Sequence, residues 1–130
     1  MYVLDTNTLI YFFKGMGNVA KHLLEVAPRD IAIPTIVLFE LEVGIAKSTS
    51  PTKRKKQLQD FIGIVNIWPF GYEEARQAAV IRSKLEKNGM VIGPYDILIA
   101  ATALSQNGTL VTHNTTEFKR VEGLDFVDWY

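Results

Sequence analysis

The chain has 130 residues, is 48% hydrophobic and contains no cysteine. These values fit one globular domain, 1–130, and exclude disulfides, thiolate metal sites and a cysteine nucleophile. Lys and Arg together number 14, as do Asp and Glu, so no overall basic excess points to a nucleic-acid partner. Because no apolar run could span a membrane and no signal peptide is recognisable, we expect a soluble cytoplasmic protein without membrane contact.

The chain opens with a short apolar run, 2–4, which predicts a buried strand, and apolar residues from Leu9 to Phe13 predict the helix that follows it. Further elements then alternate along the chain. We expect helix 19–26, strand 31–33, helix 35–47 with Thr35 as its N-cap, helix 53–62, strand 64–68, helix 72–88, a helix from Pro94 to a stop at Gly108, strand 109–112, a short helix around 117 and an edge strand 124–127. Short, continuous apolar strands between helices favour a parallel sheet covered on both faces.

An acid ends the first strand: Asp5 is followed at once by Thr6, Asn7 and Thr8. In open parallel sheets, ligands bind just outside the carboxyl ends of the strands. We therefore interpret Asp5 as the first member of a metal-binding acid cluster. Taken alone, Asp5 is equally well explained as a residue that forms a turn through its side chain.

Two further acids stand in strongly apolar helices. Glu40 lies in a segment that is apolar almost all round and should be buried, where a carboxylate is costly unless it is ion-paired or binds a metal. Glu42 is a rival on the same helix, and periodicity does not separate the two. Asp96 lies in the first turn of another apolar helix, where its alternative role is to stabilise the positive end of that helix.

Together, the three acids predict a particular chemistry. Each stands at the edge of an apolar element, and these elements would face the same rim of a parallel sheet. Three or four oxygen ligands suit Mg²⁺ or Mn²⁺. Since such an ion polarises a phosphoryl oxygen and activates a bound water, phosphodiester hydrolysis is the leading hypothesis.

A polar stretch follows the fourth predicted strand. Thr112 and Asn114 could orient the site or carry a water molecule, and Glu117 could be an outer acid. In the alternative interpretation, Asn114 or Thr115 simply caps the helix around Glu117. We expect His113 to face solvent or nucleic acid rather than a metal, because it has no histidine partner at metal-ligand spacing.

Basic residues gather at 53–56, after a loop rich in Ser and Thr. Such a run is most often a solvated helix face. If the protein binds RNA, however, Lys47, Lys53 and Arg54 are candidate phosphate contacts.

The sequence resembles the PIN-domain ribonucleases and, within them, the VapC toxins of bacterial toxin–antitoxin systems. Four motifs in order carry this resemblance, and the chain ending adds to it. They are Leu4-Asp5-Thr6-Asn7; Glu40-Leu41 with Gly44; Gly93-Pro94-Tyr95-Asp96 with Ile99-Ala100-Ala101; Val111-Thr112-His113-Asn114 with Glu117-Phe118; and the closing Gly123-Leu124 and Asp128-Trp129.

The resemblance implies a three-layer α/β/α sandwich around a short parallel sheet, and an endoribonuclease that uses Mg²⁺ or Mn²⁺. It implies Asp5, Glu40 and Asp96 as catalytic acids, with Asp5 and Asp96 on the metal, and so prefers Glu40 to Glu42. It also implies that Thr6 and Asn7 orient Asp5 or a metal-bound water.

For partners, the resemblance implies a VapB-type antitoxin that covers the active-site groove, together with a homodimer and a toxin–antitoxin hetero-oligomer. The implied substrate is tRNA, including initiator tRNA. One position departs from the family: many PIN domains carry a fourth Asp near Asn114. This departure leaves Asn114 or Glu117 to hold a water-mediated second metal position.

Two other functions remain open. A phosphatase of the haloacid dehalogenase kind would also place an Asp after its first strand, but it needs an acid where this chain has Asn7. A non-catalytic PIN-type module that binds RNA or protein is the second alternative, and the missing fourth acid at Asn114 keeps it open.

Overall fold

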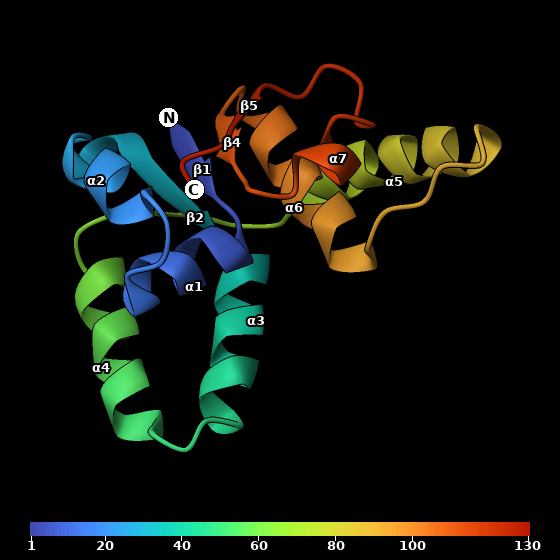
Figure 1. Ribbon diagram of the computed structural model, residues 1–130. Coiled ribbons are helices and arrows are strands. Elements are labelled where there is room, and N and C mark those ends of the chain that lie inside the picture. Colours follow the sequence, from blue (N-terminus) through green and yellow to red (C-terminus); the bar gives the residue numbers. More distant parts are fainter.

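The computed structural model describes all residues, 1–130, and is built around one five-stranded sheet (Figure 1). The strands are β1 (Tyr2–Leu4), β2 (Ile31–Pro34), β3 (Asn66–Trp68), β4 (Thr109–Val111) and β5 (Phe126–Val127). The helices are α1 (Thr6–Lys14), α2 (Val19–Leu24), the 3-10 turn η1 (Pro28–Asp30), α3 (Thr35–Ala46), α4 (Pro51–Ile62), α5 (Tyr72–Lys87), α6 (Pro94–Ser105) and α7 (Thr115–Phe118). No helix is both long enough and apolar enough to cross a bilayer.

All four strand pairings are parallel, in the order β3-β2-β1-β4-β5. Val3 and Leu4 on the central strand β1 point to opposite faces of the sheet, and neither is exposed. Helices therefore cover both faces, and the predicted three-layer α/β/α arrangement is confirmed. The buried Ala100, Ala101 and Ala103 let α6 lie close to the core.

The order of the strands defines a switch point in the sheet. From β1 the chain builds β2 and β3 on one side, and then crosses to build β4 and β5 on the other side. Ligands of open α/β sheets bind where the strand order reverses in this way, outside the carboxyl ends of the strands. In this chain that place is the gap between the ends of β1 and β4.

Two predictions are wrong, one on the N-cap of helix α3 and one on the first residue of strand β3. Thr35 is not the N-cap of α3: Pro34 holds the cap position in an extended conformation (φ −62°, ψ 144°), because β2 runs directly into the helix. The third strand begins at Asn66 rather than Ile64, which is 61% exposed in the turn after α4. Other boundaries differ by a few residues, as helix and strand ends commonly do.

The prediction that α3 is buried almost all round is also wrong. Val37 and Leu41 are buried, but Phe39 is 50% exposed and Val43 is 38% exposed. Only one side of α3 packs against the core, and on the other side the Phe39 ring meets the exposed Tyr95 ring of α6 edge-to-face at 5.6 Å. Apolar residues thus lie on a helix face that stays largely exposed.

Candidate active site

Asp5 lies at the switch point, directly after β1. Its backbone N–H donates to the Val111 carbonyl at 3.2 Å, which continues the β1–β4 pairing by one residue. Its carboxylate accepts the backbone N–H of Thr8 at 2.9 Å and so caps α1. The side chain is 5% exposed. Asp5 is therefore the turn-forming residue of the alternative interpretation, and it still presents its carboxylate at the predicted edge of the sheet.

Burial raises the pKa of the Asp5 carboxyl, and the nearby charge of Glu40 adds to that effect. Hydrogen bonds from Thr112 and Thr8 act in the opposite direction. An ionised carboxylate at this position is costly in the lone chain, because water is excluded and a second acid lies nearby. A cation in the gap would offset this cost.

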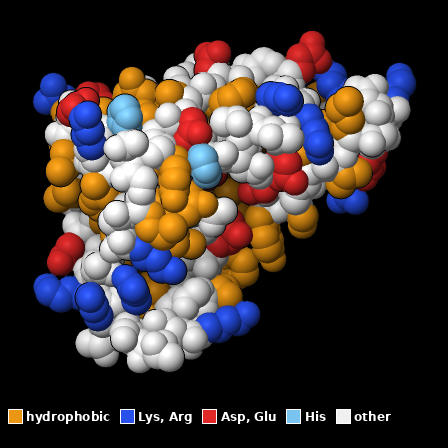
Figure 2. All heavy atoms as spheres, viewed as in Figure 1, with side chains coloured by type: hydrophobic (Ala, Val, Ile, Leu, Met, Phe, Trp, Pro, Cys, Tyr) orange, Lys and Arg blue, Asp and Glu red, His pale blue; other side chains and the backbone are white.

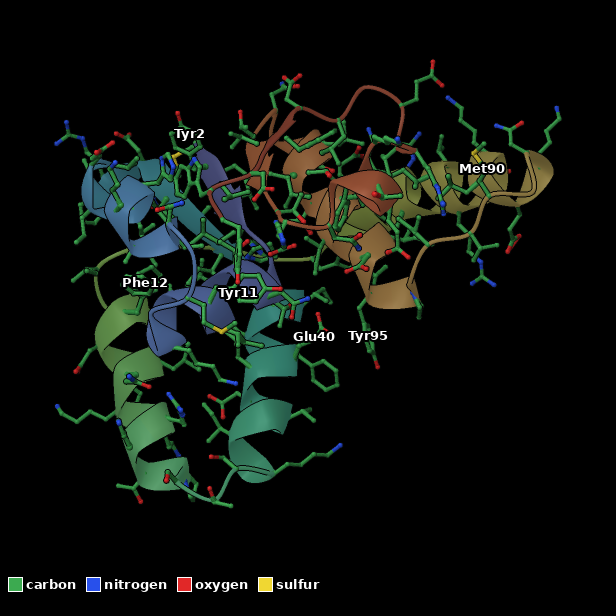
Figure 3. The ribbon with its side chains drawn as sticks, in the orientation of Figure 1. Tyr2, Tyr11, Phe12, Glu40, Met90 and Tyr95 are labelled. Carbon is green, nitrogen blue, oxygen red and sulfur yellow. The ribbon has the colours of Figure 1, made fainter.

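Glu40 reaches the same place from α3. The Thr6 hydroxyl donates to Glu40 Oε1 at 2.7 Å, so the first residue of α1 fixes the orientation of this acid. Glu40 stands midway along α3 (Thr35–Ala46), and Figure 3 shows it on the side of that helix where Tyr95 lies. Glu42 is exposed and points elsewhere, so the structure brings Glu40 and not Glu42 to the other acids.

Asp96 approaches from the first turn of α6, whose N-cap is Gly93. Burial raises the pKa of Asp96 to about 6, and the charges of Asp5, Glu117 and Glu40, together with a hydrogen bond to Glu117, act in the same direction. A Cβ atom at Gly93 would lie 3.2 Å from Asp96 Oδ2, so the glycine leaves room for this carboxylate. Asp5, Glu40, Asp96 and Glu117 thus share one acid pocket.

The loop from β4 to α7 closes the pocket. The backbone N–H of Asn114 donates to the buried Thr112 hydroxyl at 3.0 Å, and the Asn114 side-chain amide donates to Glu117 Oε2 at 2.7 Å. Asn114 occupies the N-cap position of α7 without a capping side-chain hydrogen bond, and Thr115 is already helical. Asn114 thus holds the N-cap position that the alternative gives it, but its side-chain amide donates to Glu117 and forms no hydrogen bond with the backbone of the helix end.

Carboxylate oxygens dominate this donor set, which fits a hard divalent cation better than a soft one. As the side chains stand, no three acidic or histidine groups are arranged to hold a metal ion. Burial and neighbouring negative charge raise the pKa of Asp5 and of Asp96, and a bound cation would relieve both effects.

A groove of about 310 Å³ leads away from the acid pocket between α1, α3 and α4. Its floor is apolar and consists of Ile10, Phe13, Leu41, Ile45 and Leu58. Lys14 and Arg54 stand on its walls, and Glu40 and Gly44 border it as well. Figure 2 shows basic side chains gathered over the α4 side of this face and acidic ones nearer its middle.

Of the predicted RNA contacts, Arg54 lines this groove, and Lys47, Lys53 and His113 are not among its lining residues. Lys47 and Lys53 are exposed and Arg54 is half-buried. None of the three forms an ion pair within the chain, so their charges are available to a partner. Asn7 is exposed on α1 and makes no side-chain hydrogen bond, whereas His113 binds Asp128 at 2.9 Å.

Several residues at the site were not predicted from sequence. The Thr8 hydroxyl donates to the Val111 carbonyl at 2.9 Å and ties α1 to β4. Lys14 lines the groove, and Tyr11 contacts His113. In the sequence, the only indication that these residues belong to the site is their position on α1, the helix that Asp5 caps.

Comparisons with known proteins give one consistent result. The PIN domain family model matches residues 2–124. The chain is 35% identical over 131 residues to Ribonuclease VapC2 of Rickettsia felis, which covers 99% of this chain and 98% of the relative. It is 31% identical over 128 residues to the tRNA(fMet)-specific endonuclease VapC of Salmonella typhimurium, with coverage of 98% and 97%.

Solved structures agree with the sequence relatives. VapBC2 of Rickettsia felis, bound to a DNA fragment from its promoter, superimposes with a TM-score of 0.92 at 35% identity and covers 99% of this chain and 98% of its own. DNA-bound VapBC of Salmonella typhimurium gives a TM-score of 0.92 at 32% identity, again with 99% and 98% coverage.

Proposed function

This chain belongs to the PIN-domain family and, within it, to the VapC ribonucleases, and we propose that it is the toxin of a VapBC-type pair that hydrolyses RNA with Mg²⁺ or Mn²⁺. The whole chain, 1–130, forms the PIN domain and works in the cytoplasm. One observation carries the proposal: four carboxylates meet at the topological switch point of a parallel sheet.

In this mechanism, Asp5 and Asp96 would hold the cation, with Glu40 beside them. When bound there, the ion would supply Lewis-acid stabilisation of the phosphoryl oxygen and a lowered pKa of the attacking water. Thr6 holds Glu40 in place through its 2.7 Å hydrogen bond. Asn114 holds Glu117 at 2.7 Å, so this pair can orient a water on the far side of the pocket from α3.

The proposed substrate is tRNA, with initiator tRNA as the first one to test. Support comes from the Salmonella typhimurium relative, whose name specifies tRNA(fMet) and which covers 98% of this chain. The unpaired charges of Lys47, Lys53 and Arg54 around the groove would meet RNA phosphates. They also offset the local negative charge, which would otherwise repel RNA from four acids.

The proposed antitoxin site is the groove between α1, α3 and α4. Its apolar floor suits the apolar face of an amphipathic segment, and Lys14 and Arg54 suit acidic residues on that segment. Because Glu40 borders the groove and also belongs to the acid pocket, a segment in the groove would cover the pocket. Solved relatives contain a VapB chain together with the VapC chain, which supports this partner.

We also propose a homodimer through the exposed apolar face formed by Phe39, Val43, Val91 and Tyr95. The Phe39 and Tyr95 rings meet edge-to-face at 5.6 Å, and Tyr95 and Val91 both border a second hollow, between α5 and α6. Tyr95 projects from α6 on the side of α3 in Figure 3. Exposed apolar patches of this kind mark protein interfaces.

Phe39→Asp should halve the mass measured by sedimentation, and an unchanged mass would rule out this interface.

The ribonuclease proposal is tested by two glutamates on one helix. Glu40→Gln should lower cleavage of initiator tRNA in Mg²⁺ at least about a hundredfold, because it removes a charge next to the proposed metal. Glu42→Gln, on the exposed face of α3, is the matched control and should cleave normally. Equal activity of both variants would contradict the assignment, and activity in the presence of a chelator would contradict the metal.

The same assays separate the alternative functions. A phosphatase of the haloacid dehalogenase kind would form a phospho-aspartate on Asp5, which mass spectrometry detects after acid quenching. A non-catalytic module would bind RNA or protein and show no cleavage in either metal. The carboxylate pocket favours the nuclease, because the dehalogenase-type second acid is absent at the exposed Asn7.

A further inference from the structure

A cluster of four side chains stands beside the acid pocket and has no role in the proposed mechanism. Tyr11 comes from α1, His113 from the loop after β4, and Asp128 and Tyr130 from the segment after β5. The His113 and Tyr130 rings stack with centroids 4.2 Å apart and planes 23° apart. Tyr11 meets both rings edge-on, at 6.0 Å from His113 and 4.8 Å from Tyr130. We refer to these four residues as the His113 cluster.

Asp128 holds the stack in place with both of its oxygens. Oδ2 lies 2.9 Å from His113 Nδ1, and Oδ1 accepts the Tyr130 backbone N–H at 2.9 Å. These two hydrogen bonds keep the pKa of Asp128 below its usual range, so its carboxylate stays ionised. The backbone carbonyl of Tyr130 is fixed as well, because the Asn18 backbone N–H donates to it at 2.6 Å.

Two members of the cluster stand on the same chain segments as residues of the acid pocket. His113 stands between Thr112, whose hydroxyl binds Asp5, and Asn114, whose amide binds Glu117. Tyr11 stands on α1, the helix that Asp5 caps. Figure 3 shows Tyr11 on the same face of the molecule as Glu40. A strand of RNA with a phosphate in the acid pocket would therefore pass close to these rings.

The exposure of the stack distinguishes it from an ordinary structural contact. The His113 side chain is 46% exposed and Tyr130 is 38% exposed, although both rings are held in fixed positions. A second histidine stack in the chain, His22 on Trp129 at 5.8 Å, lies against a tryptophan that is only 6% exposed. The first stack is thus preorganised and open, whereas the second fills space in the core.

We propose that His113 and Tyr130, steadied by Tyr11 and Asp128, form a platform on which an RNA base stacks beside the phosphate held in the acid pocket. The inference rests on the proposed ribonuclease function and adds a positioning site for its substrate. Four acids repel a phosphodiester, so part of the binding energy must come from a contact that does not depend on charge. Stacking of a base on an aromatic ring provides such a contact and tolerates any base.

The test measures binding and cleavage separately. Short single-stranded RNAs carrying the fluorescent base 2-aminopurine are titrated in Ca²⁺, an oxygen-binding substitute for Mg²⁺. The wild-type protein should quench the fluorescence at one position of the RNA. His113→Ala should abolish this quenching, weaken binding about tenfold and raise KM for cleavage to the same extent, with little change in kcat.

Two variants control for structure. His113→Phe keeps a flat ring on Tyr130 and should retain most of the affinity and the quenching. His22→Ala removes the buried stack next to the same chain segment and should leave both unchanged. If His113→Ala binds RNA as tightly as His22→Ala does, the platform is disproved. The platform is also disproved if His113→Ala weakens binding of the antitoxin but leaves binding of RNA unchanged.

The outcome for the platform is independent of that for the nuclease. Quenching that depends on His113, in a protein that never cleaves RNA in Mg²⁺, would sustain the platform as an RNA-binding site and reject the nuclease. Cleavage that depends on Glu40 but not on His113 would sustain the nuclease and reject the platform.

Discussion

The acid pocket and the groove beside it are built in opposite ways. In the pocket, one carboxylate is buried (Asp5) and three are half-buried, and short hydrogen bonds hold them, such as those of Thr6 to Glu40 and Asn114 to Glu117. In the groove, buried and half-buried apolar side chains line an unfilled hollow, and Lys14 and Arg54 have no acidic partner in the chain. Both arrangements cost stability in the lone chain, and each is relieved by a different partner.

This difference indicates separate roles, catalysis for the acid pocket and partner binding for the groove. In the proposed function, a cation would relieve the repulsion in the pocket, and a protein segment or RNA would cover the groove. Glu40 borders both regions, so occupancy of the groove can control access to the pocket without any change in the acids themselves. Changes in one region should therefore leave the function of the other intact, and the four predictions below test that separation.

Of these four predictions, the one with the largest expected effect fills the groove. A Cβ atom at Gly44 meets nothing within 4 Å, so Gly44→Trp should fold and place an indole over the apolar floor. Affinity for the antitoxin should fall at least about thirtyfold, as at an interface hot spot, while cleavage of a short RNA in Mg²⁺ persists. Calorimetry with the VapB-type protein measures the first effect. Ala46→Trp, on the exposed side of the same helix, is the control, and equal losses in both variants would refute the site.

A smaller effect is expected in the pocket. Thr6→Val keeps the shape of the side chain but removes the hydrogen bond to Glu40, so kcat should fall about tenfold, as for partners that orient metal ligands. Antitoxin affinity should not change. Thr116→Val, at an exposed position of α7, provides the comparison in the same cleavage assay. Loss of antitoxin binding in Thr6→Val would show that the two regions are not separable.

The charges around the groove should contribute less. Lys53→Gln and Arg54→Gln should each raise KM for tRNA a few-fold and lower the salt dependence of binding by about one counterion per residue. Lys56 already pairs with Asp60 at 3.5 Å. Lys56→Gln should therefore change neither quantity, and a change as large as that at Lys53 would assign the effect to net charge alone.

The smallest effect concerns stability and pH. Without metal, the folded chain holds protons on Asp5 and Asp96 more tightly than the unfolded chain does, whose Asp pKa is near 3.8. The stability contributed by Asp96 is complete below that value and is lost as the pH rises through about 6, and the raised pKa of Asp5 acts in the same direction. The Tm of the metal-free protein should thus drop by a few degrees between about pH 4 and about pH 7.

Added Mg²⁺ should reduce this drop, because it binds the ionised acids and not the protonated ones. Asp96→Asn should flatten the pH dependence and weaken the response to metal. Thermal melting in buffers of constant ionic strength measures both. A Tm that rises over this range in the metal-free protein would contradict the burial of these carboxyls.

Sequence patterns located the acids but could not describe the surfaces around them. Asp5 and Asp96 stand out because each is a charge at the end of an apolar run. Glu40 and Glu42 could not be separated by periodicity, since α3 has no polar face to serve as a reference. For the same reason α3 was predicted to be buried: an apolar residue that faces a partner, such as Phe39, looks the same as one that faces the core.

The His113 cluster shows a second limit of sequence reasoning. Tyr11 lies more than a hundred positions before the other three members, and an aromatic ring carries no signal that distinguishes a core position from an open one. The roles proposed here for the acids, the groove and the cluster remain predictions that the experiments above address.

The pairing of β1 with β4 also determines when the site can exist. The Thr8 hydroxyl reaches the Val111 carbonyl across 103 positions of sequence, and Thr112, Asn114 and Glu117 arrive later than Glu40 and Asp96. A chain that is still being synthesised from its N-terminus therefore carries the first acids without the strand that gathers them. The nascent polypeptide therefore cannot assemble its own acid pocket until residue 117 has been made.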